Sequence, residues 1–98
     1  MRLEAHEIAA IRDAARAIFG GTAAVRVFGS PINDHVRGGD PDLFLEVEPG
    51  QATSANEAAF RDRIGGPLDE LRVDVVFHER GQPLSPIHEI ALRDGVAL

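Results

Sequence analysis

Apolar side chains recur at three- and four-residue steps along the start of the chain. The residues that carry this pattern are Leu3, Ile8, Ile11, Ala15, Ile18 and Phe19. Such spacing places the apolar side chains on one stripe of an α-helix. Gly20 and Gly21 follow, and glycine readily adopts the positive-φ conformation at which helices commonly end. The pattern therefore predicts an amphipathic helix over residues 3–19.

Two segments in the first half of the chain carry the patterns of β-strands. Residues 24–28, Ala-Val-Arg-Val-Phe, are mostly apolar, and Gly29 follows them. Residues 42–48 alternate between two kinds of side chain, as a strand with two different faces does. One face is expected to carry Leu43, Leu45 and Val47, and the other Asp42, Phe44 and Glu46.

A second helix and a third strand are expected next. Ser54 and Glu57 have the spacing of a capping box, which predicts a helix from Ser54 to about Ile64. Residues 65–67, Gly-Gly-Pro, would end that helix. The segment 71–77 alternates again, and its two faces are expected to carry Val73, Val75 and Phe77 on one side and Asp74 and Val76 on the other.

The last segment predicts one more helix. Ser85 is suited to the N-cap and Pro86 to the first helical position, where a missing N–H leaves no helical hydrogen bond unmade. This helix is expected to reach Arg93 and to end at Gly95. Residues 96–98 are expected to add a short strand or an apolar tail. The tail is expected in the core, with contact to a partner as the alternative. The alternation of helices and strands predicts an α/β or α+β fold, a small mixed β-sheet flanked by helices.

Length and composition bound the class of protein. The 98 residues are expected to form a single domain, residues 1–98, with one hydrophobic core. No apolar run approaches the roughly 20 residues of a membrane-spanning helix, and the first residues lack the apolar stretch of a secretion signal. The chain has no cysteine, which is compatible with the cytoplasm. We therefore expect a cytoplasmic protein with no membrane partner.

The charge balance disfavours nucleic acid as the main partner. The net charge is −6, and every basic residue is an arginine. These arginines are scattered, whereas a duplex-binding surface usually shows a basic stripe. The chain also has no tyrosine or tryptophan on which bases could stack. The absence of lysine excludes the P-loop class, which needs a lysine on the phosphates.

Three features carry candidate chemistry. Gly29 and Ser30 stand at the end of the first predicted strand, Asp40 and Asp42 at the start of the second, and Asp74 in the third. Because side chains alternate along a strand, Asp40 and Asp42 share one face, roughly 6.6–7 Å apart. If Asp74 lies beside them, the carboxylates repel one another unless a cation compensates. Mg²⁺ suits such an all-oxygen site, and two ions can clamp a displacement at phosphorus.

These residues, in this order, resemble the minimal nucleotidyltransferase family of the polymerase-β-like nucleotidyltransferase superfamily. The motif of that family is Gly-Ser, a short spacer, Asp-x-Asp, and a third aspartate on a later strand. Here the matching residues are Gly29 and Ser30, Asp40 and Asp42, and Asp74. The segment from Pro86 to Val96 is also similar to the end of that family's domain, so the resemblance covers nearly the whole chain.

The resemblance implies a fold, an activity and a partner. Family members transfer a nucleoside monophosphate, usually AMP from ATP, to a hydroxyl group with the help of Mg²⁺. Short stand-alone members are often antitoxins, encoded beside an HEPN-domain ribonuclease toxin that some of them adenylylate. By the same resemblance, Gly29 and Ser30 would hold the triphosphate and Asp40 and Asp42 would bind metal. Asp74 would bind the second metal or act as base toward the acceptor hydroxyl.

Two prolines depart from the family pattern. Pro31 stands where the family often has an arginine, and it removes both a cation and an N–H donor. Arg37 could supply part of the missing charge to the nucleotide. Pro41 favours an extended Asp40 but deletes a hydrogen bond of the strand ladder. These changes favour an alternative, in which a catalytically weakened antitoxin of the same fold neutralises its toxin by stoichiometric binding.

Simpler interpretations stay open at single residues. Asp40 and Asp42 also fit a solvated turn, and Asp74 could face solvent from a half-exposed strand. A small metal-dependent nuclease built on these carboxylates is disfavoured by the acidic composition. Glu46 and Glu48 are expected in solvent. Surface or capping positions are expected for all four histidines, His6, His35, His78 and His88.

Overall fold

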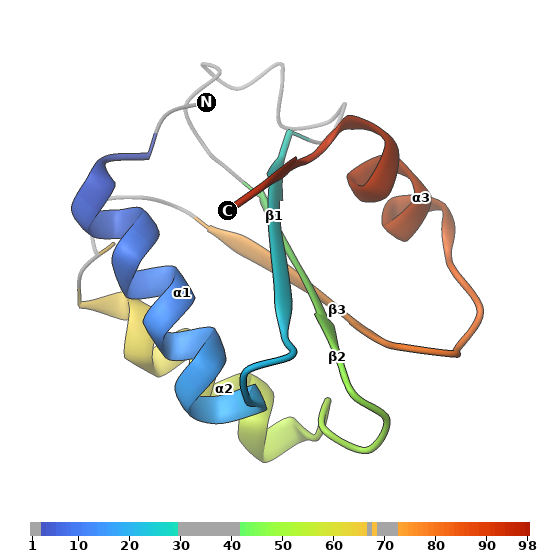
Figure 1. Cartoon of the computed structure of the whole chain (residues 1–98), viewed down its shortest axis with the longest axis horizontal. Helices are drawn as coiled ribbons and strands as arrows, with labels where there is room; N and C mark the ends of the chain where they lie inside the picture. The colour runs from blue at the N-terminus through green and yellow to red at the C-terminus, as the bar shows by residue number, and fades with distance from the viewer. Residues whose placement is uncertain (1–2, 30–41, 67, 69–72) are drawn as a thin grey trace.

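The computed structural model describes residues 3–29, 42–66, 68 and 73–98, and it has helices on both faces of a mixed β-sheet (Figure 1). The helices are α1 (Ala5–Phe19), α2 (Ser54–Gly65) and α3 (Pro86–Asp94). The strands are β1 (Ala24–Phe28), β2 (Asp42–Val47), β3 (Asp74–Glu79) and β4 (Val96–Ala97). The predicted fold class, a small mixed sheet flanked by helices, is confirmed.

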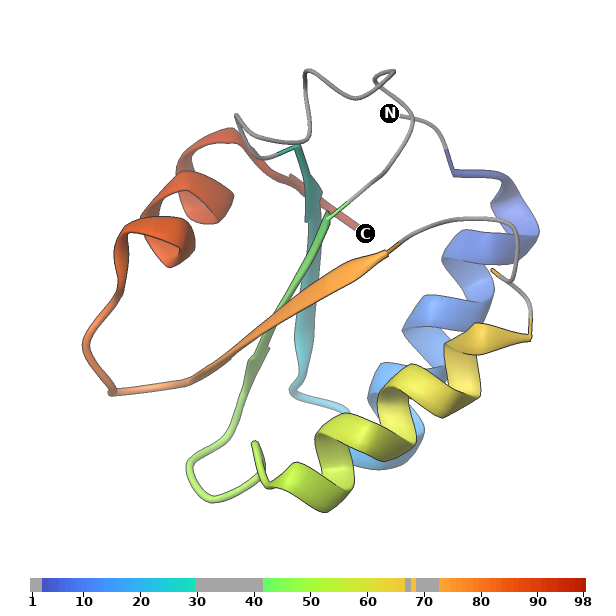
Figure 2. The ribbon, with the colours of Figure 1, turned by 180° about the vertical axis from the view of Figure 1, so that it is seen from behind.

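The sheet has the order β3-β2-β1-β4 and both kinds of strand pairing. β1 is antiparallel to β2 and to β4, whereas β2 and β3 are parallel. A parallel pair needs a long connection from one end of the sheet to the other, and α2 lies within that connection. α1 and α2 cover one face of the sheet and α3 covers the other (Figures 1 and 2).

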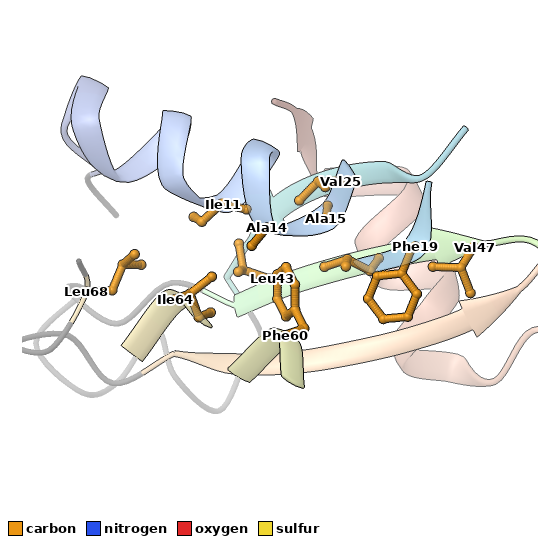
Figure 3. Close-up of a cluster of buried hydrophobic side chains, with 11 residues drawn as sticks. Ile11, Ala14, Ala15, Phe19, Val25, Leu43, Val47, Phe60, Ile64 and Leu68 are labelled. Atoms are coloured by element: carbon orange, nitrogen blue, oxygen red, sulfur yellow. The ribbon is translucent and has the colours of Figure 1, made fainter. Parts of the chain in front are cut away.

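The main core lies between the sheet and the pair α1 and α2 (Figure 3). The predicted inward face of β2 is confirmed, because Leu43, Leu45 and Val47 have no exposed surface. The buried residues that surround them are Ile11, Ala14, Ala15, Phe19, Val25, Phe60, Ile64 and Leu68. Phe60 contacts the rings of Phe19 and Phe77 at centroid distances of 6.1 and 6.0 Å. Of the predicted apolar stripe of the first helix, Ile11, Ala15 and Phe19 are buried, and Leu3 and Ile18 pack against this core half-buried.

A smaller core lies beneath α3 on the opposite face of the sheet. Phe28 and Phe44 are buried there against Ala91, and half-buried Ile87 and Ile90 pack beside them. The even-numbered side chains of β1 and β2 face this core and the odd-numbered ones face the main core, and for β2 the alternation predicted this.

Two helix starts can be compared with their predictions. Ser85 is the N-cap of α3 and Pro86 its first residue, as predicted, and the Ser85 N–H donates to Nδ1 of His88 at 3.0 Å. α2 begins at Ser54, as predicted, but its N-cap is not the residue that the capping-box pattern indicated. Thr53, rather than Ser54, is the N-cap, because its backbone is extended and its Oγ1 accepts the Asn56 N–H at 3.1 Å.

The end of the third strand and the chain's last residues differ from the predictions. β3 continues to Glu79, two residues beyond the predicted end, because it stays in register with β2 as far as Val47. Val96 and Ala97 do form a short strand with β1. The expectation that this tail belongs to the core was wrong for Val96, which is 63% exposed on an outer strand.

The prediction that all four histidines lie at surface or capping positions is wrong for His78. Its side chain is buried, and its register partner on β2 is Glu46. Nδ1 of His78 lies 3.0 Å from Oε2 of Glu46, and Nε2 lies 2.9 Å from the Gln82 carbonyl oxygen. Glu46 is correspondingly held by His78 and Arg80 rather than standing free in solvent. His88 does cap α3, as predicted, and its ring contacts that of His78 at 4.8 Å.

The turn between α3 and β4 leaves no room for a side chain at Gly95. A Cβ there would clash with the Ala91 carbonyl oxygen and would lie 3.2 Å from Cβ of Arg26. Gly95→Ala is therefore expected to lower the free energy of unfolding by about 1–3 kcal/mol, as overpacking typically does.

Gly65→Ala is the matched control for Gly95→Ala. Position 65 is helical, and an added Cβ would meet nothing within 4 Å. There we expect a gain of up to about 1 kcal/mol from helix propensity. Urea denaturation followed by circular dichroism measures both changes, and a Gly95→Ala protein as stable as wild type would contradict the tight packing of this turn.

A membrane span requires a helix that is both long and strongly apolar, and the helices in the described part of the chain do not meet both requirements.

Candidate functional site

The ends of three strands meet at one end of the sheet (Figure 2). Phe28, the last residue of β1, pairs with Asp42, the first residue of β2. Asp42 in turn pairs with Asp74, the first residue of β3. Because β1 is antiparallel to β2 and β2 is parallel to β3, the end of β1 and the starts of β2 and β3 lie side by side. The fold therefore brings together two aspartates that are far apart in sequence.

Asp42 and Asp74 occupy the face of the sheet that α3 covers. Each aspartate precedes by two residues a side chain of the α3 core, Phe44 or Val76, and side chains two apart share a face. Neighbouring strands are roughly 4.8 Å apart, so the two carboxylates are adjacent on this face. Asp42 is buried, at 3% exposure, whereas Asp74 is exposed. We call these two residues the acidic pair.

Gly29 is the other predicted site residue that the structure describes. It directly follows Phe28 and is half-buried, so it stands beyond the register pair of Phe28 and Asp42 at the same end of the sheet. Ser30, Arg37 and Asp40 lie outside the described residues, as do the two prolines at positions 31 and 41. Their predicted roles stay predictions.

The donor atoms of the acidic pair suit magnesium. Mg²⁺ is commonly held by one or two carboxylates together with waters and substrate phosphates, so two adjacent aspartates are a fitting partial ligand set. Among the residues that the structure describes, no group of three His, Asp or Glu side chains is arranged to hold a metal ion. The predicted third carboxylate, Asp40, is not among those residues.

Glu46 and His78 form a second polar pair on the same face, and the sequence analysis missed it. They follow Asp42 and Asp74 by four residues each, so the same register that joins the aspartates joins them. The two ring nitrogens of His78 face Oε2 of Glu46 and the carbonyl oxygen of Gln82. The sequence could have indicated this pair, because Glu46 and His78 each follow one of the two aspartates by four residues. The pair ties β2 to β3 beneath α3 and lies at the opposite end of these strands from the acidic pair.

Comparison of this chain with protein-family models, with curated proteins and with solved structures found no match in any of the three.

Proposed function

We propose that this chain is a magnesium-dependent nucleotidyltransferase that transfers AMP from ATP to a hydroxyl group of a partner protein. The observation that carries the proposal is the register pairing of Asp42 with Asp74 beside the end of β1. The three motifs, Gly-Ser, Asp-x-Asp and the later Asp, would then lie together at one end of the sheet. If the two aspartates were merely solvated, there would be no reason for the end of β1 to lie beside them.

The two aspartates differ in exposure, and the difference suits two roles. Buried Asp42 is fixed by the strands around it, so its carboxylate is suited to hold a cation in one position. Exposed Asp74 is accessible to a second molecule and can accept the proton of an acceptor hydroxyl. Magnesium, when bound, would offset the charge of the triphosphate and of the leaving group.

The proposed reaction is a displacement at the α-phosphorus of ATP. The acceptor oxygen forms a bond to that phosphorus while the bond to the bridging oxygen breaks, and pyrophosphate leaves. Asp74 takes the hydroxyl proton. Gly29 has no side chain, so its backbone would allow the phosphates to approach closely.

The proposed partner is an HEPN-type ribonuclease toxin, which follows from the family resemblance. The second candidate function, neutralisation of that toxin by stoichiometric binding, is favoured by a different observation. Three apolar residues before, within and after α3 are exposed: Leu84 at 41%, Leu92 at 36% and Val96 at 63%. Such residues are suited to contact a protein partner directly, and direct contact is all that stoichiometric binding requires.

Thermal unfolding with Mg²⁺ and ATP tests whether the acidic pair binds the nucleotide. A ligand that binds only the folded state stabilises it by about 2.7 kcal/mol at a hundredfold excess over Kd. For a domain of this size, that corresponds to a rise in Tm of roughly 10 °C or more. We expect this rise in the wild type and its loss in Asp74→Asn, which removes one charge at an exposed position.

Asp62→Asn provides the control for that experiment. Asp62 is an exposed aspartate on α2, on the other side of the sheet, so its variant should keep the full rise in Tm. Equal shifts in the wild type and in Asp74→Asn would rule out the acidic pair as the nucleotide site.

A further inference from the structure

A cavity of about 170 Å³ opens beside the start of β1. It lies between the second half of α1 and the strands β1 and β4, and the residues that line it include Arg12, Arg16, Gly21, Ala23 and Leu98. The acidic pair lies beside the end of β1, so the two sites occupy opposite ends of that strand. The proposed nucleotidyl transfer does not use this cavity.

Two arginines one helical turn apart line the cavity. Arg12 and Arg16 are exposed residues of α1 at positions i and i+4, a spacing that puts side chains on the same face of a helix. Like charges at this spacing repel one another. Elsewhere in the described residues, Arg61, Arg80 and Arg93 form ion pairs with nearby carboxylates. Arg12 and Arg16 form no ion pair with any residue that the structure describes.

The dipole of helix α1 accounts for the presence of only one of these two arginines. Arg16 lies in the last turn of the helix, where a cation offsets the negative end of the helix dipole. Arg12 lies a full turn earlier, where that effect has largely fallen off. The net charge of the protein is −6, yet two arginine side chains lie together at this cavity.

The rest of the cavity leaves the guanidinium groups accessible. The other lining residues described by the structure have small or apolar side chains, among them Ala15, Gly20, Gly21 and Ala23, and no lining side chain is acidic. The volume is well below the roughly 300–1,000 Å³ of pockets for drug-sized ligands. The cavity thus has room for one anionic group on a small molecule but not for a nucleotide.

We propose that this cavity binds a small anion whose phosphate or carboxylate group lies between the guanidinium groups of Arg12 and Arg16. Guanidinium groups donate paired hydrogen bonds to either kind of anion. A shared anion would also relieve the repulsion between the two arginines.

Titration with inorganic phosphate and with succinate tests the proposal, at an ionic strength held constant with sodium chloride. Backbone amide resonances in two-dimensional NMR spectra report the binding position. For at least one probe, we expect saturating shifts centred on Gly21, Ala23 and Ala24 in the wild-type protein. The probe that binds more tightly identifies the phosphate or the carboxylate as the preferred group.

Substitution of both arginines should weaken that binding. Arg12→Gln/Arg16→Gln removes two charge-assisted contacts, so we expect the affinity to fall by about tenfold or more. Arg63→Gln, which removes an exposed arginine of α2, should bind as the wild type does. If the double variant does not fold, Arg12→Gln alone replaces it, with the same direction expected.

Three results would overturn the proposal: shifts that fail to saturate with either probe, shifts centred elsewhere, or an unchanged affinity in the arginine variant. The test is independent of the proposed activity. The stabilisation by Mg²⁺ and ATP belongs to the other end of β1 and should be the same in Arg12→Gln/Arg16→Gln as in the wild type.

Discussion

The Asp74→Asn protein is expected to transfer AMP about 10²–10⁴ times more slowly than the wild type, the range that a positioned general base contributes. Asparagine has nearly the shape of aspartate but cannot take the proton of the acceptor hydroxyl. Because Asp74 is exposed at the start of an outer strand, its replacement should leave the fold and any partner interface intact. Loss of AMP transfer without loss of partner binding is therefore the expected signature.

Intact-mass spectrometry of the partner protein measures this effect. The partner is incubated with Mg²⁺, ATP and either the wild type, Asp74→Asn or the control Asp62→Asn. We expect mass increments of one AMP unit with the wild type and the control, and almost none with Asp74→Asn. A partner whose mass stays unchanged, but whose ribonuclease activity is blocked at an equimolar ratio, would support stoichiometric binding instead. Pro31→Arg would then be the first reversion to test.

Phe60→Ala is expected to destabilise the fold more than Gly95→Ala does, with a loss of about 3–5 kcal/mol in the free energy of unfolding. The Phe60 side chain has no exposed surface and contacts the rings of Phe19 and Phe77. It also joins α2 to the sheet, so the cavity left by its removal would lie at the centre of the main core. For a domain whose total stability is typically about 5–15 kcal/mol, such a loss would leave a large unfolded fraction at moderate temperature.

Chemical denaturation of Phe60→Ala and Leu84→Ala provides the comparison. Leu84 is 41% exposed, so its truncation should change the free energy of unfolding by less than about 0.5 kcal/mol. If Phe60→Ala were as stable as Leu84→Ala, the side chain of Phe60 could not be packed between α2 and the sheet.

The sequence predicted the elements of this fold well, because each depends on neighbouring residues. The alternation of Leu43, Leu45 and Val47 with polar and aromatic residues predicted both faces of β2, and the structure confirms them. Ser85 and Pro86 marked the start of α3 by local capping chemistry. The error at α2 has a local cause as well. Thr53 and Ser54 are both good N-caps, and only the backbone conformation decides between them.

The site was less predictable, because it depends on strand register. That Asp42 pairs with Asp74 was an explicit condition of the prediction, and periodicity could not supply it. The burial of His78 was missed for the same reason. From the sequence alone, a histidine near the end of a strand is expected at the surface. The contacts of its two ring nitrogens with Glu46 and the Gln82 carbonyl oxygen are visible only in the structure. The roles of Ser30, Arg37 and Asp40 stay predictions.

The position of β3 at the border of the sheet has a consequence for solubility. Exposed border strands can pair with strands of other molecules, and charged side chains are one of the features by which proteins prevent this aggregation. In β3 the apolar run from Val75 to Phe77 lies between Asp74 and Glu79, so an acidic residue stands at each end of the strand. A substitution that neutralises Asp74 removes one of those two charges. The aspartate proposed for catalysis would thereby also oppose strand-to-strand pairing between molecules at high concentration.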